Sequence, residues 1–248
     1  MEDLIKKAAK DLAASKDVVA LTGAGISVES KIPPFRGKGG LWEKIDPMEY
    51  AHIDAFKKNP TKVWNVLLKD MKEIIDKAIP NDAHKGLARL EELGILKTII
   101  TQNIDGLHQM AGNTDVIEFH GTYKWHRCMD CKNRCKSSRI DLTNIPPLCD
   151  CGGIYRPEVV LFGEIIPPEH LWRSKQLASD CDLMLVIGTS ATVQPAALMP
   201  HIAKESGSKV IEINPEETLL TGSISDYLIL GKAGEVMNSI ITELEHLL

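Results

Sequence analysis

Hydrophobic residues follow two different periodicities along this chain. Apolar positions recur at helical spacing in four segments, residues 3–15, 61–78, 81–94 and 236–248. Short apolar runs of the strand type occupy residues 17–21, 96–101, 116–121, 159–164, 183–187, 210–213 and 225–230. Runs that are apolar on both sides are typical of buried parallel strands. Their alternation with helices predicts an α/β fold, a Rossmann-like parallel sheet with helices on both faces.

Small or polar residues follow most of the predicted strands. These strand ends are Gln102-Asn103-Ile104-Asp105, His120-Gly121, Gly188-Thr189-Ser190 and Asn214-Pro215-Glu216. The carboxyl ends of parallel strands share one edge of a sheet, where doubly wound folds bind their ligands. No single end is specific, since such residues also form turns and helix caps. Their repetition along one edge predicts a nucleotide cleft, and His120 there could act as a general base or have a structural role.

The first predicted strand leads into Gly23-Ala24-Gly25-Ile26-Ser27. Glycines let a backbone turn sharply and approach a ligand closely, and a helix beginning near Ser27 would direct free N–H groups toward a phosphate. The third glycine of the dinucleotide fingerprint is missing. The motif alone therefore fits either a phosphate-binding corner or a purely structural turn.

Residues 30–60 are rich in proline, glycine and charge. A connection of this length often serves as a lid or binding loop. Phe35 and Arg36 are its candidate binding residues, although a packed aromatic ring and a surface cation explain them equally well. After the strand-like run 159–164, the glycine at 163 could let a bound peptide add as an extra strand; a core strand is the alternative.

Residues 122–157 interrupt the α/β alternation and carry five of the six cysteines. Cys128 and Cys131 form one chelating pair, and Cys149 and Cys151 form a second pair one residue shorter than the common spacing. Four thiolates can close a tetrahedral structural Zn²⁺ site, which leaves little room for a reactive water. Cys135 could replace Cys149 or Cys151 as a ligand, or remain free.

Composition narrows the class of protein further. The chain has 248 residues, 44% of them hydrophobic, enough for one large domain or a domain with an inserted module. No apolar run reaches the ~18 residues of a membrane span, and the charged N-terminus lacks a signal-peptide core. We therefore expect a cytoplasmic protein. Its formal charge of -5 predicts no direct binding to nucleic acid and favours peptide or protein partners.

The motifs and their order along the chain resemble those of sirtuins, which are NAD-dependent protein lysine deacylases. The resemblance covers essentially the full chain. The matching residues include Gly23-Ala24-Gly25-Ile26-Ser27, Ile32-Pro33 with Phe35-Arg36, the four strand ends, the cysteine pairs and Val160-Leu161-Phe162-Gly163-Glu164. The resemblance implies a large Rossmann-like domain of about residues 1–35, 85–121 and 158–248. A small lobe would combine helical residues 36–84 with the zinc module 122–157.

The resemblance also assigns roles to residues. NAD would be held by Gly23, Ala24, Gly25, Ile26, Phe35, Arg36, Gln102, Asn103, Ile104, Asp105, Gly188, Thr189, Ser190, Asn214, Pro215, Glu216 and Ala233. Asn103 and Asp105 would hold the nicotinamide and its ribose, and His120 would deprotonate a ribose hydroxyl. Val160, Leu161, Phe162, Gly163 and Glu164 would bind the backbone of an acyl-lysine peptide. The products would be free lysine, nicotinamide and an O-acyl-ADP-ribose.

Four positions test this resemblance against the family pattern. Lys31 stands where the family usually has glycine, and Pro34 replaces the usual aspartate or threonine. Members that remove succinyl groups carry a tyrosine and an arginine where this chain has Leu67 and Asp70. Because Asp70 would repel a carboxylate, we expect neutral acyl groups to be preferred.

Two other functions share the same cofactor-binding motifs. A mono-ADP-ribosyltransferase would let an amino-acid nucleophile attack the ribose carbon. A non-catalytic module would bind NAD or acylated lysine, but it would not need His120, Asn103 and Asp105 together.

Overall fold

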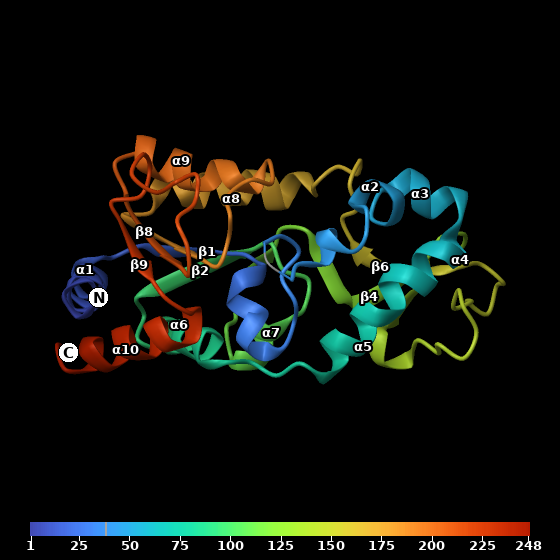
Figure 1. The fold of residues 1–248 in the computed structure, drawn as a ribbon, viewed down its shortest axis with the longest axis horizontal. Helices are drawn as coiled ribbons and strands as arrows, with labels where there is room; N and C mark the ends of the chain where they lie inside the picture. The colour runs from blue at the N-terminus through green and yellow to red at the C-terminus, as the bar shows by residue number, and fades with distance from the viewer. Residues whose placement is uncertain (38) are drawn as a thin grey trace.

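A six-stranded parallel sheet is the largest element of the computed structural model, which describes residues 1–37 and 39–248 (Figure 1). The strand order is β3-β2-β1-β7-β8-β9. The bounds are β1 Val18–Thr22, β2 Leu96–Thr101, β3 Val116–Glu118, β7 Leu183–Ile187, β8 Lys209–Asn214 and β9 Tyr227–Leu230. All neighbouring pairs run parallel. The predicted α/β class is confirmed.

Alternate residues of the strands face two helical layers. Val18 and Ala20 belong to a core with α1 (Glu2–Ala14), α6 (Asp82–Glu92) and α10 (Ala233–Glu245). Val19 and Leu21 belong to a second core with α8 (Pro168–Asp180) and α9 (Met199–Glu205). Figure 1 shows α8 and α9 above the sheet and α6 and α10 below it. Burial on both faces explains why the strands are continuously apolar.

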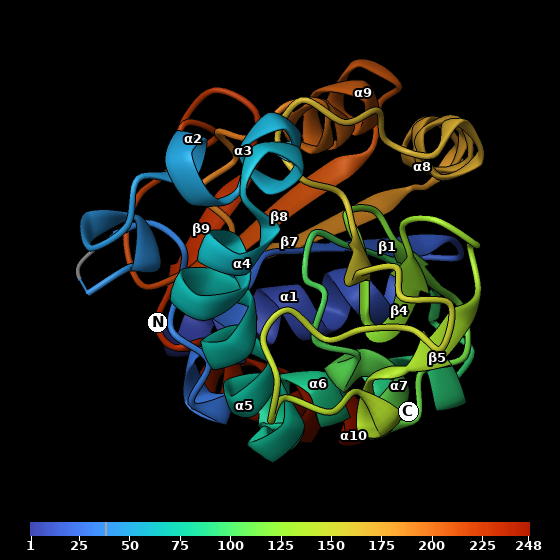
Figure 2. The same ribbon diagram turned by 90° about the vertical axis from the view of Figure 1, so that its right-hand side faces the viewer.

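A third core joins two segments that are separate in sequence (Figure 2). One is helical: α2 (Pro47–Tyr50), α3 (Ile53–Lys58), α4 (Pro60–Val63) and α5 (Lys69–Lys77). The other is an antiparallel sheet of order β5-β4-β6, with β4 Gly121–Cys128, β5 Arg134–Lys136 and β6 Tyr155–Val159. The fully buried Trp64 links them, because its Nε1 donates to the Tyr155 carbonyl at 3.0 Å. The domain boundaries drawn from the sequence stay a prediction.

The apolar run 159–164 is not a strand of the parallel sheet. β6 ends at Val159, and the residues that follow form a loop with one bridge, between Phe162 and His52. Val159 and Leu161 are nevertheless buried. Their hydrophobicity thus reflects burial in the third core, and periodicity alone does not distinguish the two cases.

Several other boundaries also differ from the sequence pattern. A short 3₁₀ helix already begins at Ala24 and ends at Ser30. The predicted helix 61–78 is a continuous helical stretch, but a π-helical turn, Trp64–Leu68, separates α4 from α5. The segment 30–60 contains α2, α3 and a 3₁₀ turn at Leu41–Glu43. A short helix, α7, covers Leu107–Ala111. None of the described helices combines the length and apolarity that crossing a bilayer requires.

The strand order reverses between β1 and β7. Chains leaving such a pair diverge to opposite sides, which opens a crevice beyond the carboxyl ends of the strands. The residues that follow β1 and β7 are therefore where a ligand site is expected.

Candidate functional site

The loops that follow β1 and β7 touch at the reversal point. The N–H of Gly25 donates to the Gly188 carbonyl at 2.7 Å, and a Cβ on Gly25 would lie 2.7 Å from the Gly188 Cα. Gly188 itself has φ +62°, and its Cβ would lie 2.3 Å from the Ile26 nitrogen. Glycine is therefore required here for contact between two backbones. The glycine pattern alone indicates only a turn or a close approach to a ligand.

A cleft of about 1020 Å³ opens above this contact. Most predicted site residues line it: Ala24, Gly25, Phe35, Arg36, Gln102, Asn103, Ile104, His120, Val160, Leu161, Phe162, Gly163, Glu164, Gly188, Thr189, Ser190, Asn214, Pro215, Glu216 and Ala233. Gly23 and Ile26 do not line it. Asp105 lines a smaller adjoining cavity of about 70 Å³, which shares Ala24, Phe35 and Asn103 with the cleft. The structure thus brings together four strand ends and the loop near Phe35.

Asn103 and Asp105 are held by a buried hydrogen-bond network. The amide of Asn103 donates to the Gly23 carbonyl at 3.1 Å and to the Ser27 hydroxyl at 3.2 Å. Ser27 in turn donates to the Asp105 carboxylate at 2.8 Å. Burial raises the pKa of Asp105, while hydrogen bonds from Leu107 N–H and Ser27 oppose that rise. Ser27 is thus a site residue absent from the predicted set, although it lies within the glycine motif.

His120 follows β3 and lines the cleft. Its Nδ1 lies 3.0 Å from the Gln102 carbonyl, which can only accept, so Nδ1 carries the proton and Nε2 keeps a free lone pair. Burial lowers the pKa of His120, against a smaller opposing effect of the Gln102 hydrogen bond. At neutral pH the ring is therefore an uncharged base beside the cleft.

Hydrogen bonds also tie three strand ends to one another. The Gln102 amide, after β2, donates to the Thr189 hydroxyl at 3.0 Å. The Asn214 amide, at the end of β8, donates to the Thr189 carbonyl at 3.0 Å. These bonds hold the wall of the cleft rigid between β2, β7 and β8.

The loop carrying Phe35 and Arg36 is closed by aromatic packing. Phe35 stacks on Trp42 with ring centroids 5.3 Å apart, and the backbone N–H of Trp42 donates to the Phe35 carbonyl at 2.9 Å. Trp42 also lines the cleft, together with residues 192–195 and 217–219. These residues are not among the site residues predicted from the sequence. The segments 192–195 and 217–219 directly extend two predicted strand ends, which is the signal that could have revealed them.

Lys31, which stands where the family usually has glycine, adopts the left-handed conformation. Its φ is 66° and its ψ is 21°, at the end of the Ala24–Ser30 helix. A side chain there costs roughly 1 kcal/mol relative to glycine. We expect Lys31→Gly to raise the free energy of unfolding by about 0.5–1 kcal/mol, measured by urea denaturation. Lys44, with φ -105°, provides the control: Lys44→Gly should not stabilise. Equal effects of both substitutions would contradict the strain.

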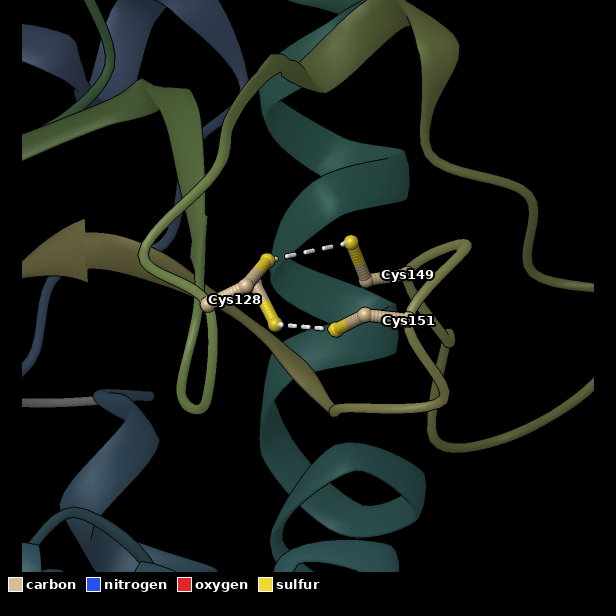
Figure 3. A group of neighbouring side chains, drawn as sticks. Cys128, Cys149 and Cys151 are labelled. Carbon is tan, nitrogen blue, oxygen red and sulfur yellow. Dashed lines mark hydrogen bonds between the residues drawn. The ribbon is translucent and has the colours of Figure 1, made fainter.

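Four cysteine sulfurs form a second candidate site away from the parallel sheet (Figure 3). The Sγ atoms of Cys128, Cys131, Cys149 and Cys151 all lie within 4.8 Å of one another. The Cys128–Cys151 and Cys131–Cys149 distances are 3.5 and 3.7 Å. A tetrahedral zinc with Zn–S bonds of about 2.3 Å would space its sulfurs about 3.8 Å apart. The four thiols therefore fit Zn²⁺.

The short second pair is accommodated by a tight turn. The Cys149 N–H donates to the Gly153 carbonyl, and Leu148 bridges Ile154 across the turn. Cys149 and Cys151 can therefore point at one ion although a single residue separates them. Cys135 is not in the group; its Sγ donates to the Lys136 carbonyl at 3.5 Å.

Fold and site together define an α/β protein with a cleft where the strand order reverses and a cluster of four cysteines that could hold a metal ion. A model of the Sir2 family matches residues 23–195. NAD-dependent protein deacylase 1 of Archaeoglobus fulgidus is 49% identical over 95% of this chain and 96% of that protein. The chain belongs to the Sir2 family.

Two solved structures extend this likeness to three dimensions. A Sir2 homologue in complex with NAD superposes with a TM-score of 0.89 at 47% identity, over 97% of this chain and 94% of that chain. Sir2Af2 bound to a myristoylated histone peptide superposes at 0.82 with 40% identity, over 100% and 98% of the two chains.

Proposed function

We propose that this chain is an NAD-dependent protein lysine deacylase that removes acetyl or other neutral acyl groups and yields nicotinamide and O-acyl-ADP-ribose. One observation carries the proposal: four strand ends and the uncharged His120 line a single cleft large enough for a dinucleotide and an acyl-lysine. The family's deacylases and their complexes with NAD and acylated peptide agree with this chemistry. NAD is a co-substrate, consumed in the reaction.

The geometry of the cleft supports the roles that we propose for its residues. We assign NAD to Gly23, Ala24, Gly25, Ile26, Phe35 and Arg36, to residues 102–105, 188–190 and 214–216, and to Ala233 at the beginning of α10. Most of these residues line the cleft, and Asp105 lines the adjoining cavity. Asn103 and Asp105, braced by Ser27, would hold the nicotinamide riboside end. The lone pair on Nε2 of His120 would accept a proton from a ribose hydroxyl. Zinc would be bound by Cys128, Cys131, Cys149 and Cys151 and would support the fold of the small lobe.

Acyl-lysine peptides and proteins are the substrates in this proposal. We also propose that the protein is cytoplasmic and that it does not bind nucleic acid directly. The chain would be divided into the large domain and the small lobe described from the sequence. The overall charge of -5 supports the absence of direct nucleic-acid binding, because a negatively charged protein has no general attraction to a polyanion.

The decisive experiment incubates the protein with an acetyl-lysine peptide, with and without NAD, and follows all products by mass spectrometry. We expect a peptide that is lighter by one acetyl group, together with nicotinamide and O-acetyl-ADP-ribose, only when NAD is present. A protein or peptide that instead gains ADP-ribose would identify a mono-ADP-ribosyltransferase. Binding of NAD or acetyl-peptide without any product would identify a non-catalytic module.

The acyl preference follows from the lining of the smaller cavity. Asp70 and Leu67 line it with Met71 and other apolar residues of the α4–α5 helix. A succinyl carboxylate would meet a like charge there and find no cation. We expect kcat/KM for an acetyl-peptide to exceed that for the matched succinyl-peptide at least about tenfold. Asp70→Arg should lower the ratio of kcat/KM for the acetyl-peptide to kcat/KM for the succinyl-peptide. Faster desuccinylation than deacetylation by the wild-type chain would refute the preference for neutral acyl groups.

A further inference from the structure

An ion pair braces the segment proposed to bind the substrate peptide, residues 160–164. Arg156, in β6, donates to both carboxylate oxygens of Glu164, from Nη1 at 2.8 Å and from Nη2 at 2.7 Å. The two side chains are only 13% and 26% exposed. Two parallel bonds in a partly buried place fix direction as well as distance, unlike an ordinary surface pair.

The same two side chains also hold the backbone of the segment. Arg156 Nη2 donates to the Val159 carbonyl at 2.7 Å, and the Glu164 carboxylate accepts from the Leu161 N–H at 2.9 Å. Burial would raise the pKa of Glu164, but hydrogen bonding and attraction from Arg156 lower it overall. The carboxylate is therefore ionised at neutral pH, and it links the end of the segment to the backbone of Leu161. It is turned toward Arg156, although the sequence placed Glu164 among the residues that touch substrate.

The other anchors of the segment lie nearer its beginning. The Val160 N–H donates to the His120 carbonyl at 2.8 Å. The Phe162 N–H and carbonyl bond to Ala51 and Ile53 at 2.9 and 3.0 Å. Beyond Glu164 the next side chain, Ile165, is 87% exposed. At the end of the segment, the Glu164 N–H donates to the Leu161 carbonyl at 3.0 Å, within the segment itself. Among the described residues, Arg156 supplies the hydrogen bonds that reach Glu164 from outside the segment.

Gly163 lies between these anchors, in the part of the segment that faces the cleft. It has φ +84°, and a Cβ there would lie 2.6 Å from the His52 ring. Within the described part of the chain, its N–H donates to no protein acceptor. That donor is available to a peptide carbonyl, and its direction depends on the braced residue beside it.

We propose that Arg156 is a positioning residue for peptide binding, acting through Glu164 to orient the backbone of residues 160–164. The inference rests on the proposed function, since it concerns the same cleft. Because Val160 is bonded to His120, the brace also fixes the peptide relative to the base. Among the described residues, the side-chain hydrogen bonds of Arg156 reach only Pro157, Val159 and Glu164 and none of the proposed NAD-binding residues after β1, β7 and β8. Its loss should therefore weaken peptide binding and spare the binding of the dinucleotide.

The test compares Arg156→Met, Arg156→Lys and Glu164→Gln with the wild-type chain. Fluorescence anisotropy gives the Kd of a labelled acetyl-lysine peptide, calorimetry gives the Kd of NAD, and steady-state assays give both KM values. We expect Arg156→Met to weaken peptide binding about tenfold, since hydrogen bonds between charged groups are worth at least that factor. NAD affinity should change less than about twofold. Arg156→Lys should be intermediate, because lysine keeps the charge and loses the planar fork.

Arg127→Met is the matched control. Arg127, in β4 of the same sheet, pairs with Glu158 at 2.6 Å and is half exposed. It should bind peptide like the wild type. Unchanged peptide affinity in Arg156→Met, or equal weakening in Arg127→Met, would overturn the inference. If Arg156→Met gives no cooperative unfolding transition, the peptide Kd of Glu164→Gln tests the inference instead. This substitution removes the charge of the Glu164 side chain and preserves its shape.

These outcomes also separate the inference from the function on which it rests. A wild-type chain without NAD-dependent turnover would refute the proposed deacylase. Anisotropy requires no turnover and would still report whether Arg156 controls peptide affinity. A wild-type chain that does not bind the acetyl-peptide overturns both.

Discussion

Replacing His120 by alanine should lower kcat for deacylation by a factor of about 10²–10⁴, the usual contribution of a general base. The ring lines the cleft with Nδ1 committed to the Gln102 carbonyl, so no other nitrogen of the residue can substitute for Nε2. NAD binding should survive, because the glycine contact and the Gln102–Thr189–Asn214 bonds do not involve the imidazole. Single-turnover assays and NAD calorimetry measure the two effects separately. Near-normal turnover would refute the assignment.

The direction of the His120 pKa adds a pH dependence. The base is active only when neutral, and burial holds its pKa below the ordinary value of 6.5. Activity of the wild-type chain should therefore persist as the pH falls to 6.5 and decline only in more acidic solution. A kcat/KM profile that falls already above pH 7 would require a different base.

Removing zinc should have the second large effect, on stability. Cys128 and Cys149 are buried in the third core, beside Tyr155 and Val159 of the antiparallel sheet. Structural zinc sites contribute on the order of 10 kcal/mol to the folding of small modules. We expect chelation, or Cys149→Ala, to remove about one zinc per chain and to abolish hydrogen-exchange protection in β4, β5 and β6. Protection in the six-stranded sheet should persist, because its two cores contain no zinc ligand.

Cys135→Ser is the control for that experiment. The Cys135 sulfur lies outside the four-sulfur group and bonds to a backbone carbonyl. Elemental analysis should still find one zinc per chain, and the unfolding midpoint should stay near that of the wild type. Loss of zinc from Cys135→Ser would mean that the ligand set is wrong.

Some features were predictable because they depend on local sequence. The buried strands β1, β2, β7 and β8 were found from short apolar runs, since burial on both faces leaves an unmistakable composition. The cap of α6 also depends on local sequence: Asn81, a residue type preferred at helix N-termini, accepts from the N–H groups of Ala83 and His84. The cysteine spacing predicted a chelating cluster for the same reason.

Other features could not be read from local patterns. The run 159–164 has the composition of a strand, but its Phe162 backbone bonds to residues 51 and 53, a segment distant in sequence. The role of Ser27 depends on Asn103 and Asp105 approaching it from another strand end. Trp42 joined the cleft because it stacks on Phe35. The Cys135 sulfur lies outside the group of four sulfurs, a placement that the cysteine spacing left open.

The sequence by itself determined which segments are buried strands, which residues with useful chemistry follow them, and that four thiolates can gather on one ion. Only the tertiary structure decided that β1 lies beside β7, so that Gly25 meets Gly188 and the cleft opens there. It also decided that Glu164 turns inward to Arg156. The physical reason is range: hydrophobic period and spacing describe neighbours along the chain, whereas strand order and side-chain direction depend on packing between distant segments.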